Sequence, residues 1–190
     1  MKIKKLEQVT RQRWLNLFVV DYDHNGHEGQ WVFASRNEKP FATHDDAVVI
    51  VPVLRNPGQP PRLVMIREFR VPIGDYVYGL PAGLVERGEP IEGAIRREMH
   101  EETGYEVTKV RRVTQPMYTT PGLSDEAVSM AFIDVTGDEN TKAKPEASED
   151  IEVLLLDHPA ICRLCQDKSA RIDVKAWVVL HLFEQLGRLE

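Results

Sequence analysis

Residues 83–105 read GLVERGEPIEGAIRREMHEETGY, and the second half of this segment has the pattern of an amphipathic helix. Pro90 suits the first position of a helix, apolar residues then recur every three or four positions, and Gly104 provides a stop signal. We therefore predict a helix that begins at Pro90 and ends at Thr103.

Three carboxylates gather near the C-terminal end of this predicted helix. At about 100° per residue, Glu98, Glu101 and Glu102 fall within an arc of roughly 100°, beside the apolar stripe that begins at Ile91. Like charges at these spacings disfavour a helix and oppose its macrodipole, so a cation is expected nearby. An isolated Glu-x-x-Glu-Glu is more often a solvated face. At the margin of a buried stripe, however, such oxygens suit Mg²⁺ or Mn²⁺.

The chain before this segment contains two predicted hairpins. Residues 14–23 and 30–36 are rich in β-branched and aromatic residues and surround an Asn-Gly turn signal. Residues 47–54 are a continuous apolar run, and a turn cluster separates them from a second strand pattern at 62–70.

The chain after the segment alternates strand, loop and helix signals. The predicted elements are strands at 109–115, 128–135 and 151–156, a polar loop at 136–150, a short helix that follows Asp157-His158-Pro159 and ends at Gln166, and a longer helix from about 172 to 186. Strands interleaved with two or three helices indicate an α/β or α+β layer architecture.

Composition excludes several classes of protein. The 190 residues, 42% of them hydrophobic, suffice for one domain with a full core. No apolar run approaches the roughly 20 residues of a membrane span. A net charge of −6 without a basic block argues against nucleic-acid binding. With two cysteines and no signal-peptide pattern, we expect a cytoplasmic protein. Cys162 and Cys165 form a single CxxC, too little for a zinc site.

The 83–105 segment matches the pattern G-x5-E-x7-R-E-U-x-E-E-x-G-U, and it resembles the signature box of the Nudix hydrolases. The fixed positions of the pattern are filled by Gly83, Glu89, Arg97, Glu98, Glu101, Glu102 and Gly104. One position departs from it, because Tyr105 stands where the pattern prefers a bulky aliphatic residue. The resemblance implies a Nudix α/β/α sandwich with a mixed sheet, preceded by an N-terminal antiparallel hairpin.

The resemblance also implies roles for the residues of the box. Glu98 and Glu102 are expected to bind the metal ion, together with the backbone carbonyl of Ala82. Glu101 is either a third ligand or a carboxylate that orients metal-bound water. Arg97 can pair with Glu101. Glu89 is expected to be a structural partner of Arg97, and Gly83 and Gly104 are structural positions.

Residues outside the box resemble one subgroup, the ADP-ribose pyrophosphatase-like enzymes, which split nucleoside diphosphate sugars. Pro121 and Gly122 follow the end of the box at the subgroup's spacing, and the strand that includes Arg67 and Arg70 resembles its entry into the box. Arg70 is the first candidate for binding a substrate phosphate, followed by Arg67 and Arg36. Pro121 and Gly122 complete the candidate substrate-binding set.

The general base is left open between three glutamates. Glu149 aligns best with the subgroup's acidic loop, Glu146 is the fallback, and Glu101 competes with both. In relatives the base lies a couple of positions earlier, where this chain has Ala147.

The resemblance therefore implies Mg²⁺- or Mn²⁺-dependent hydrolysis of a nucleoside diphosphate sugar, with ADP-ribose split to AMP and ribose 5-phosphate as the leading reaction. GDP-mannose or another nucleotide sugar is the alternative substrate. A Nudix-like module that senses a nucleotide without hydrolysing it is the alternative of another class. Residues 1–40 are expected to form an arm exchanged across a homodimer, and residues 41–190 the catalytic domain.

Overall fold

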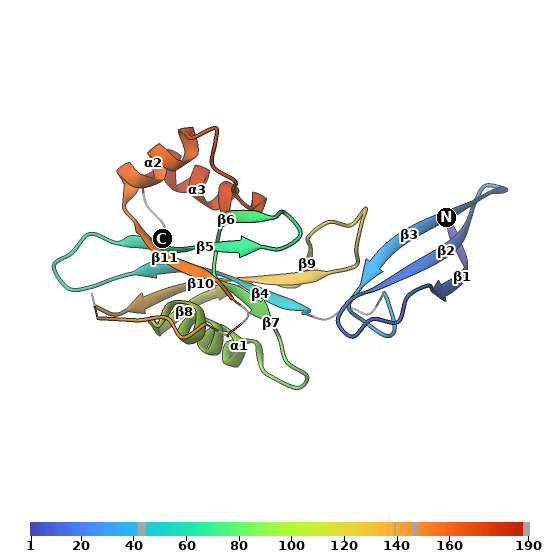
Figure 1. Cartoon of the computed structure of the whole chain (residues 1–190), viewed down its shortest axis with the longest axis horizontal. Helices are drawn as coiled ribbons and strands as arrows, with labels where there is room; N and C mark the ends of the chain where they lie inside the picture. Colours follow the sequence, from blue (N-terminus) through green and yellow to red (C-terminus); the bar gives the residue numbers. More distant parts are fainter. Residues whose placement is uncertain (42–44, 139, 146, 148, 188–190) are drawn as a thin grey trace. The chain divides into compact units, whose positions relative to one another are not determined.

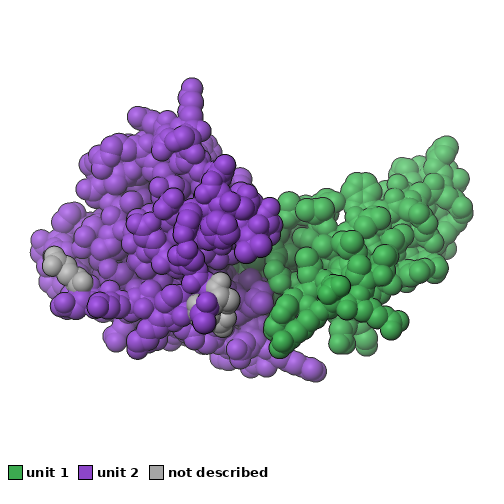
Figure 2. All heavy atoms as spheres, in the orientation of Figure 1, with its two compact units in different colours: residues 1–46, 115–129 green, residues 47–114, 130–190 purple. Residues whose placement is uncertain are grey.

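The computed structural model describes residues 1–41, 45–138, 140–145, 147 and 149–187. The chain divides into two compact units, which Figure 2 colours separately. Unit 1 comprises residues 1–46 and 115–129, and unit 2 comprises residues 47–114 and 130–190. Unit 1 therefore contains residues 1–40 together with a distant segment that the sequence analysis did not assign to them, and the exchange of residues 1–40 as an arm stays a prediction.

Unit 1 is built on a three-stranded antiparallel sheet of β1 (Lys2–Gln8), β2 (Asn16–His24) and β3 (His27–Ser35), in that order. Asn25 and Gly26 form the turn between β2 and β3 with φ angles of 53° and 84°. This positive-φ pair is typical of a two-residue hairpin turn, so the first predicted hairpin is confirmed. The β1 strand was not predicted, because all seven of its residues are exposed and give no buried-face alternation.

One face of this sheet has a small core. Phe18, Val20 and Phe33 are buried together, and the rings of Phe18 and Phe33 stack at 5.7 Å between centroids. Trp31 and Val32 on β3 remain 53% and 55% exposed. The sheet therefore buries a few apolar side chains and leaves others in contact with solvent.

The main sheet has the strand order β11-β5-β4-β10-β8 (Figure 1). These strands are β4 (Ala47–Leu54), β5 (Arg62–Arg70), β8 (Glu106–Val113), β10 (Ala127–Thr136) and β11 (Ile151–Leu156). Three shorter strands extend the sheet: β6 (Asp75–Gly79) pairs with β5, β7 (Ala82–Leu84) with β4, and β9 (Met117–Tyr118) with β10. The β4 and β5 strands form the second predicted hairpin.

Helices cover both faces of the main sheet. The box helix α1 (Ile91–Glu98) packs on β4, β7 and β8, whereas α2 (His158–Gln166) packs on β11 and α3 (Val174–Leu186) on β6. Figure 1 shows the sheet between α1 on one side and the α2–α3 pair on the other, which confirms the predicted α/β/α sandwich. No helix within the described residues combines the length and apolar character needed to cross a membrane.

The core of unit 2 joins the box helix to the central strands. Its buried members include Ile50, Val64, Ile95, Met99, Tyr105, Ile133 and Val135. Tyr105 is 6% exposed and packs in this cluster, so an aromatic ring takes the place of the expected aliphatic side chain.

The predicted box helix is correct in position but not in its last turn. Pro90 caps the helix with extended backbone, α1 ends at Glu98, and residues Met99–Thr103 form a π-helical turn, η1. Gly104 stops the helix with a φ of 76°. A π-helical turn widens the backbone and occurs frequently at functional sites. The 100° spacing used to place the three glutamates therefore does not hold beyond Glu98.

Candidate active site

Gly83 has no Cβ atom, and this leaves room for the carboxylate of Glu98. A Cβ atom built at Gly83 on β7 would overlap the carboxylate group of Glu98. The Glu98 side chain is 11% exposed, and burial raises its pKa even though the Arg97 guanidinium lies beside it. A glycine is thus required at position 83 because the carboxylate of Glu98 lies directly against the backbone.

Glu102 is the most deeply buried acid of the box. It is 3% exposed, and its Oε2 accepts a hydrogen bond of 2.9 Å from the backbone N–H of Ala82. Burial raises the pKa of Glu102 to about 8, and the charges of Glu98 and Glu68 add to this rise. The structure thus brings Ala82 and Glu102 together through the Ala82 N–H. Metal binding by the Ala82 carbonyl stays a prediction.

Arg97 supplies the cation that the clustered carboxylates require. Its Nε and Nη2 donate to the two oxygens of Glu89 at 3.1 and 3.0 Å, and its Nη1 donates to Glu98 at 2.6 Å. The same Nη1 lies 3.2 Å from Glu101, and Nη2 also donates to the carbonyl of Leu84. The predicted pairings of Arg97 with Glu89 and Glu101 are both present. Hydrogen bonding to Arg97 lowers the pKa of Glu89, as expected for a structural ion pair.

Glu101 differs from the other two box acids. Its side chain is 39% exposed, and its backbone carbonyl accepts a 2.7 Å hydrogen bond from the N–H of Lys144. The three carboxylates that were expected to share one patch differ in burial, although Arg97 Nη1 contacts both Glu98 and Glu101. Glu98 and Glu102 face the interior, whereas Glu101 lies at the edge of the site, because the π-helical turn changes the direction of the side chains that follow Glu98.

The β5 strand adds a fourth acid that the sequence analysis missed. Glu68 Oε2 is buried and has no hydrogen-bond partner among the described residues, although Arg70 Nη2 lies 2.7 Å away without hydrogen-bond geometry. Burial raises the pKa of Glu68, and its charge in turn raises that of Glu102. Because Arg70 lies two positions further along the strand, both side chains share the face of β5 that lies near the box.

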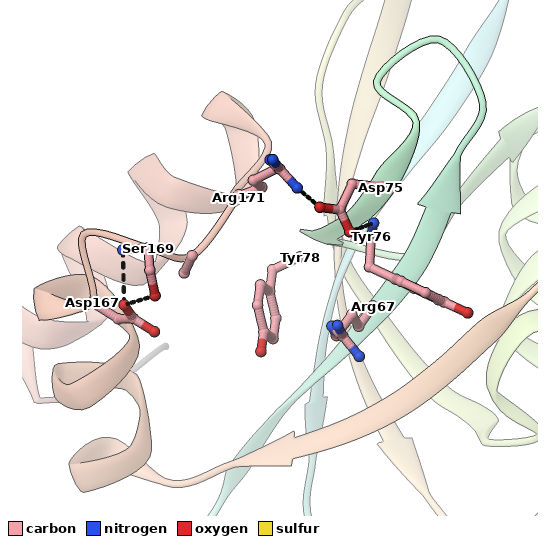
Figure 3. A pocket seen from close by; sticks show the side chains of 8 residues that line it. Arg67, Asp75, Tyr76, Tyr78, Asp167, Ser169 and Arg171 are labelled. Carbon is pink, nitrogen blue, oxygen red and sulfur yellow. Dashed lines mark hydrogen bonds and ion pairs between the residues drawn. The ribbon is translucent and has the colours of Figure 1, made fainter.

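Arg67 lies on the opposite face of the same strand, by the alternation of side chains along β5. There it lines a pocket of about 210 Å³, and its guanidinium lies 4.5 Å from the centre of the Tyr76 ring. Figure 3 shows this pocket between β5, β6 and the loop that joins α2 to α3, with Tyr78 and Arg171 on its walls. The charged groups here are paired, Arg67 with Glu152 at 3.4 Å. The structure does not bring Arg67 together with the box carboxylates.

The remaining substrate-binding candidates lie in unit 1. Arg36 Nε forms an ion pair of 3.2 Å with Glu126. The carbonyl of Gly122 accepts a hydrogen bond from Trp31 Nε1, and Pro121 lies in the same turn. Their roles toward a substrate stay predictions.

One candidate base lies close to the box and another lies outside the described residues. The charge of Glu149 raises the pKa values of Glu68, Glu98 and Glu102, so its carboxylate is near all three acids. Glu146 lies outside the described residues.

The donor atoms of the box fit a divalent cation. Within the described part of the chain, no three His, Cys, Asp or Glu side chains converge closely enough to hold a metal ion, and this includes Cys162 and Cys165. The donor set nevertheless suits a hard divalent cation, because Glu98 and Glu102 bring two buried carboxylates to the same side of the box. Because Gly83 has no Cβ atom, the Glu98 carboxylate can lie directly against the backbone of β7.

Comparison with known proteins identifies relatives of the whole fold. The family model described as the NUDIX domain matches residues 43–174. The chain is 34% identical over 160 residues to a putative nudix hydrolase 2 of Caenorhabditis elegans, covering 82% of this chain and 71% of the relative. It is 30% identical over 155 residues to an ADP-sugar pyrophosphatase of Mus musculus, covering 79% and 70% of the two chains.

Two further matches cover more of the chain. An ADP-ribose pyrophosphatase of Bacillus subtilis is 28% identical over 177 residues, which are 93% of this chain and 89% of the relative. A solved structure described as an ADP compounds hydrolase superposes with a TM-score of 0.72, covering 99% of this chain and 96% of the other at 21% identity. At that identity the superposition supports the fold alone.

Proposed function

The chain belongs to the Nudix family, and from this premise we propose that it hydrolyses the pyrophosphate bond of a nucleoside diphosphate sugar. The observation that carries the proposal is the buried pair Glu98 and Glu102, held against β7 by Gly83 and the Ala82 N–H. Keeping two carboxylates in a low-dielectric site is costly unless they bind a cation. The geometry therefore favours a metal-dependent hydrolase over a module that only senses a nucleotide.

ADP-ribose is the proposed substrate, and AMP and ribose 5-phosphate are the proposed products. The ADP-sugar and ADP-ribose pyrophosphatases among the relatives support this choice. GDP-mannose or another nucleotide sugar remains the alternative, because the residues that read the base and the sugar lie outside the box.

Glu98 and Glu102 would hold Mg²⁺ or Mn²⁺, with Glu101 at the edge of the same site. A bound ion of this kind neutralises the charge of the pyrophosphate and lowers the pKa of the attacking water. Arg70 would bind a substrate phosphate, and Glu68 beside it would hold the guanidinium.

Glu149 is the proposed general base, since its carboxylate lies near the acids of the box. It would accept a proton as the water oxygen bonds to phosphorus and the bridging P–O bond breaks. Glu101 and Glu146 remain the alternatives for this role.

We also propose that residues 1–40 exchange between the subunits of a homodimer. The support is the apolar surface of unit 1, where Trp31, Val32 and Leu17 are 53%, 55% and 43% exposed. Replacing Val32 by Lys should shift sedimentation velocity from a dimer to a monomer. A wild type that sediments as a monomer at micromolar concentration would contradict the exchange. The two free cysteines support a reducing, cytoplasmic location.

The experiment that tests the function is a Mg²⁺-dependent turnover assay on ADP-ribose, GDP-mannose, UDP-glucose and a nucleoside triphosphate in ¹⁸O-water. We expect AMP and ribose 5-phosphate from ADP-ribose, with the label in one product showing which phosphorus is attacked. A preference for another nucleotide sugar would replace the substrate and keep the mechanism. Tight binding of ADP-ribose without turnover of any diphosphate would contradict hydrolysis and support the sensor.

A further inference from the structure

The loop between β10 and β11, residues 137–150, is attached to the end of the box at three described points. Gly137 packs against the ring of Tyr105, and Lys142 passes close to Gly104, where a Cβ atom would lie 2.6 Å from the Lys142 carbonyl carbon. The N–H of Lys144 donates to the carbonyl of Glu101 at 2.7 Å. The first half of the loop thus follows the π-helical turn that carries Glu101 and Glu102.

The far end of the loop is attached to a different part of unit 2. The N–H of Phe69 on β5 donates to the Asp150 carbonyl at 3.1 Å, and the Tyr76 hydroxyl donates to the Asp150 carboxylate. Glu149 immediately precedes Asp150, and its negative charge raises the pKa values of Glu98 and Glu102. Glu149 thus belongs to a loop whose first half contacts the end of the box and whose last residue, Asp150, is held by β5 and β6.

The contact between Gly137 and Tyr105 leaves no room for a side chain. A Cβ atom at Gly137 would lie 2.5 Å from Cδ1 and 2.7 Å from Cε1 of the Tyr105 ring, and 2.8 Å from Thr141 Oγ1. The ring is 6% exposed within the core of unit 2, so it has little freedom to move aside. Gly137 does not have a positive φ, so only this steric overlap disfavours alanine there.

We propose that Tyr105 and Gly137 are positioning residues, whose contact fixes the path of the loop and thereby places Glu149 for the reaction. This inference rests on the proposed function, in which Glu149 accepts the proton from water. It gives a physical reason for the aromatic residue at the last box position: the ring reaches the loop and pairs with a glycine 32 positions further along the chain.

The test is a double-mutant cycle of Gly137→Ala and Tyr105→Val, with kcat, KM, Mn²⁺ affinity and hydrogen exchange of the Lys144 amide measured for each protein. We expect Gly137→Ala to lower kcat about tenfold or more, since small displacements of catalytic groups are that costly. KM and Mn²⁺ affinity should stay within about twofold, because Arg70 and the metal carboxylates are untouched. Exchange at Lys144 should become faster.

The second mutation tells positioning from a general loss of packing. Tyr105→Val removes the Cδ and Cε atoms that overlap the new methyl group, so in its background the kcat penalty of Gly137→Ala should fall below about threefold. Gly79→Ala is the matched control, because Gly79 lacks a positive φ and its nearest neighbour is 4.0 Å from a built Cβ. A penalty of equal size in both Tyr105 backgrounds would overturn the proposal.

Other outcomes are equally decisive. Unchanged kcat in Gly137→Ala despite faster exchange at Lys144 would show that the loop's path does not matter for catalysis. If Gly137→Ala does not fold, Lys144→Pro removes the N–H that donates to Glu101 and should lower kcat at unchanged Mn²⁺ affinity; unchanged kcat there would overturn the proposal. A wild type that turns over no diphosphate contradicts the proposed function instead, while exchange at Lys144 still reports whether the ring holds the loop.

Discussion

The box in unit 2 and the three-stranded sheet of unit 1 depart from ordinary protein surfaces in opposite ways. The box buries charge, with Glu98 and Glu102 8% and 3% exposed. The sheet exposes apolar groups, with Trp31 and Val32 more than half exposed. Buried carboxylates favour the binding of a further cation beside Arg97, and exposed apolar side chains favour contact with a second apolar surface.

The largest expected effect of this difference is on catalysis. Glu98→Gln and Glu102→Gln should each lower the turnover of ADP-ribose at least about 100-fold, because they remove charge from the metal site while keeping the shape of the side chain. Glu28→Gln in unit 1 is the matched control, since this acid is exposed and only pairs with Lys4. Near-normal turnover in both box variants, with unchanged circular dichroism, would contradict the proposal that Glu98 and Glu102 bind the metal ion.

A second comparison concerns the ion pairs of the two regions. Arg97→Ala should lower the free energy of unfolding by about 2 kcal/mol, because it leaves Glu98 buried without its cation. Lys4→Ala in unit 1 should cause no measurable change, since its partners Asp23 and Glu28 are accessible to water. Urea denaturation of both variants measures the contrast, and equal changes would show that burial does not distinguish the two sites.

The strands beside the box were predictable from local signals. The apolar runs that became β4 and β11 are bounded by turn residues, and the structure places both at the predicted bounds. The C-terminal end of α2 at Gln166 was also correct, but the helix begins at His158, two residues earlier than predicted, because Asp157 accepts a hydrogen bond from Ala160 N–H as an N-cap. Local propensity and burial agree in these segments, so the sequence alone was sufficient.

Other features were beyond the sequence for identifiable reasons. Side-chain periodicity cannot reveal the wider turn at η1, so Glu101 was grouped with the buried acids. Glu68 follows Arg67 in a strand that ends in charged residues, and its burial comes from the surrounding fold. The segment 115–129 joins unit 1 through contacts such as the bridge between Ala34 and Ser124, which no local pattern encodes.

The buried acid of the box should also make stability depend on pH in metal-free protein. The pKa of Glu102 is about 8 in the folded state and near 4.5 without burial. Between these values the folded state binds a proton that the unfolded state does not, so stability falls as pH rises and is lowest above pH 8. The melting temperature with EDTA should fall by roughly 8 °C more in wild type than in Glu102→Gln between pH 5 and pH 8.5. If the melting temperatures of the two proteins changed equally with pH, the raised pKa of Glu102 would be contradicted.

The smallest expected effect lies in the turn of unit 1. Gly26 has a φ of 84° and open space around it, so Gly26→Ala should cost about 1 kcal/mol from backbone strain alone. Turnover per active site should stay unchanged if the turn only shapes the β2–β3 hairpin. Loss of turnover in this variant, at unchanged stability, would mean that the hairpin tip takes part in the reaction.

The most direct test of the central claim is a Mn²⁺ titration of metal-free protein, followed by electron paramagnetic resonance, in wild type and Glu102→Gln. We expect saturable binding to wild type and a weakening of at least about tenfold in the variant, because a buried carboxylate of the site has lost its charge. Equal Mn²⁺ affinity in the two proteins, or no saturable binding to wild type, would contradict the assignment of the box as a metal site.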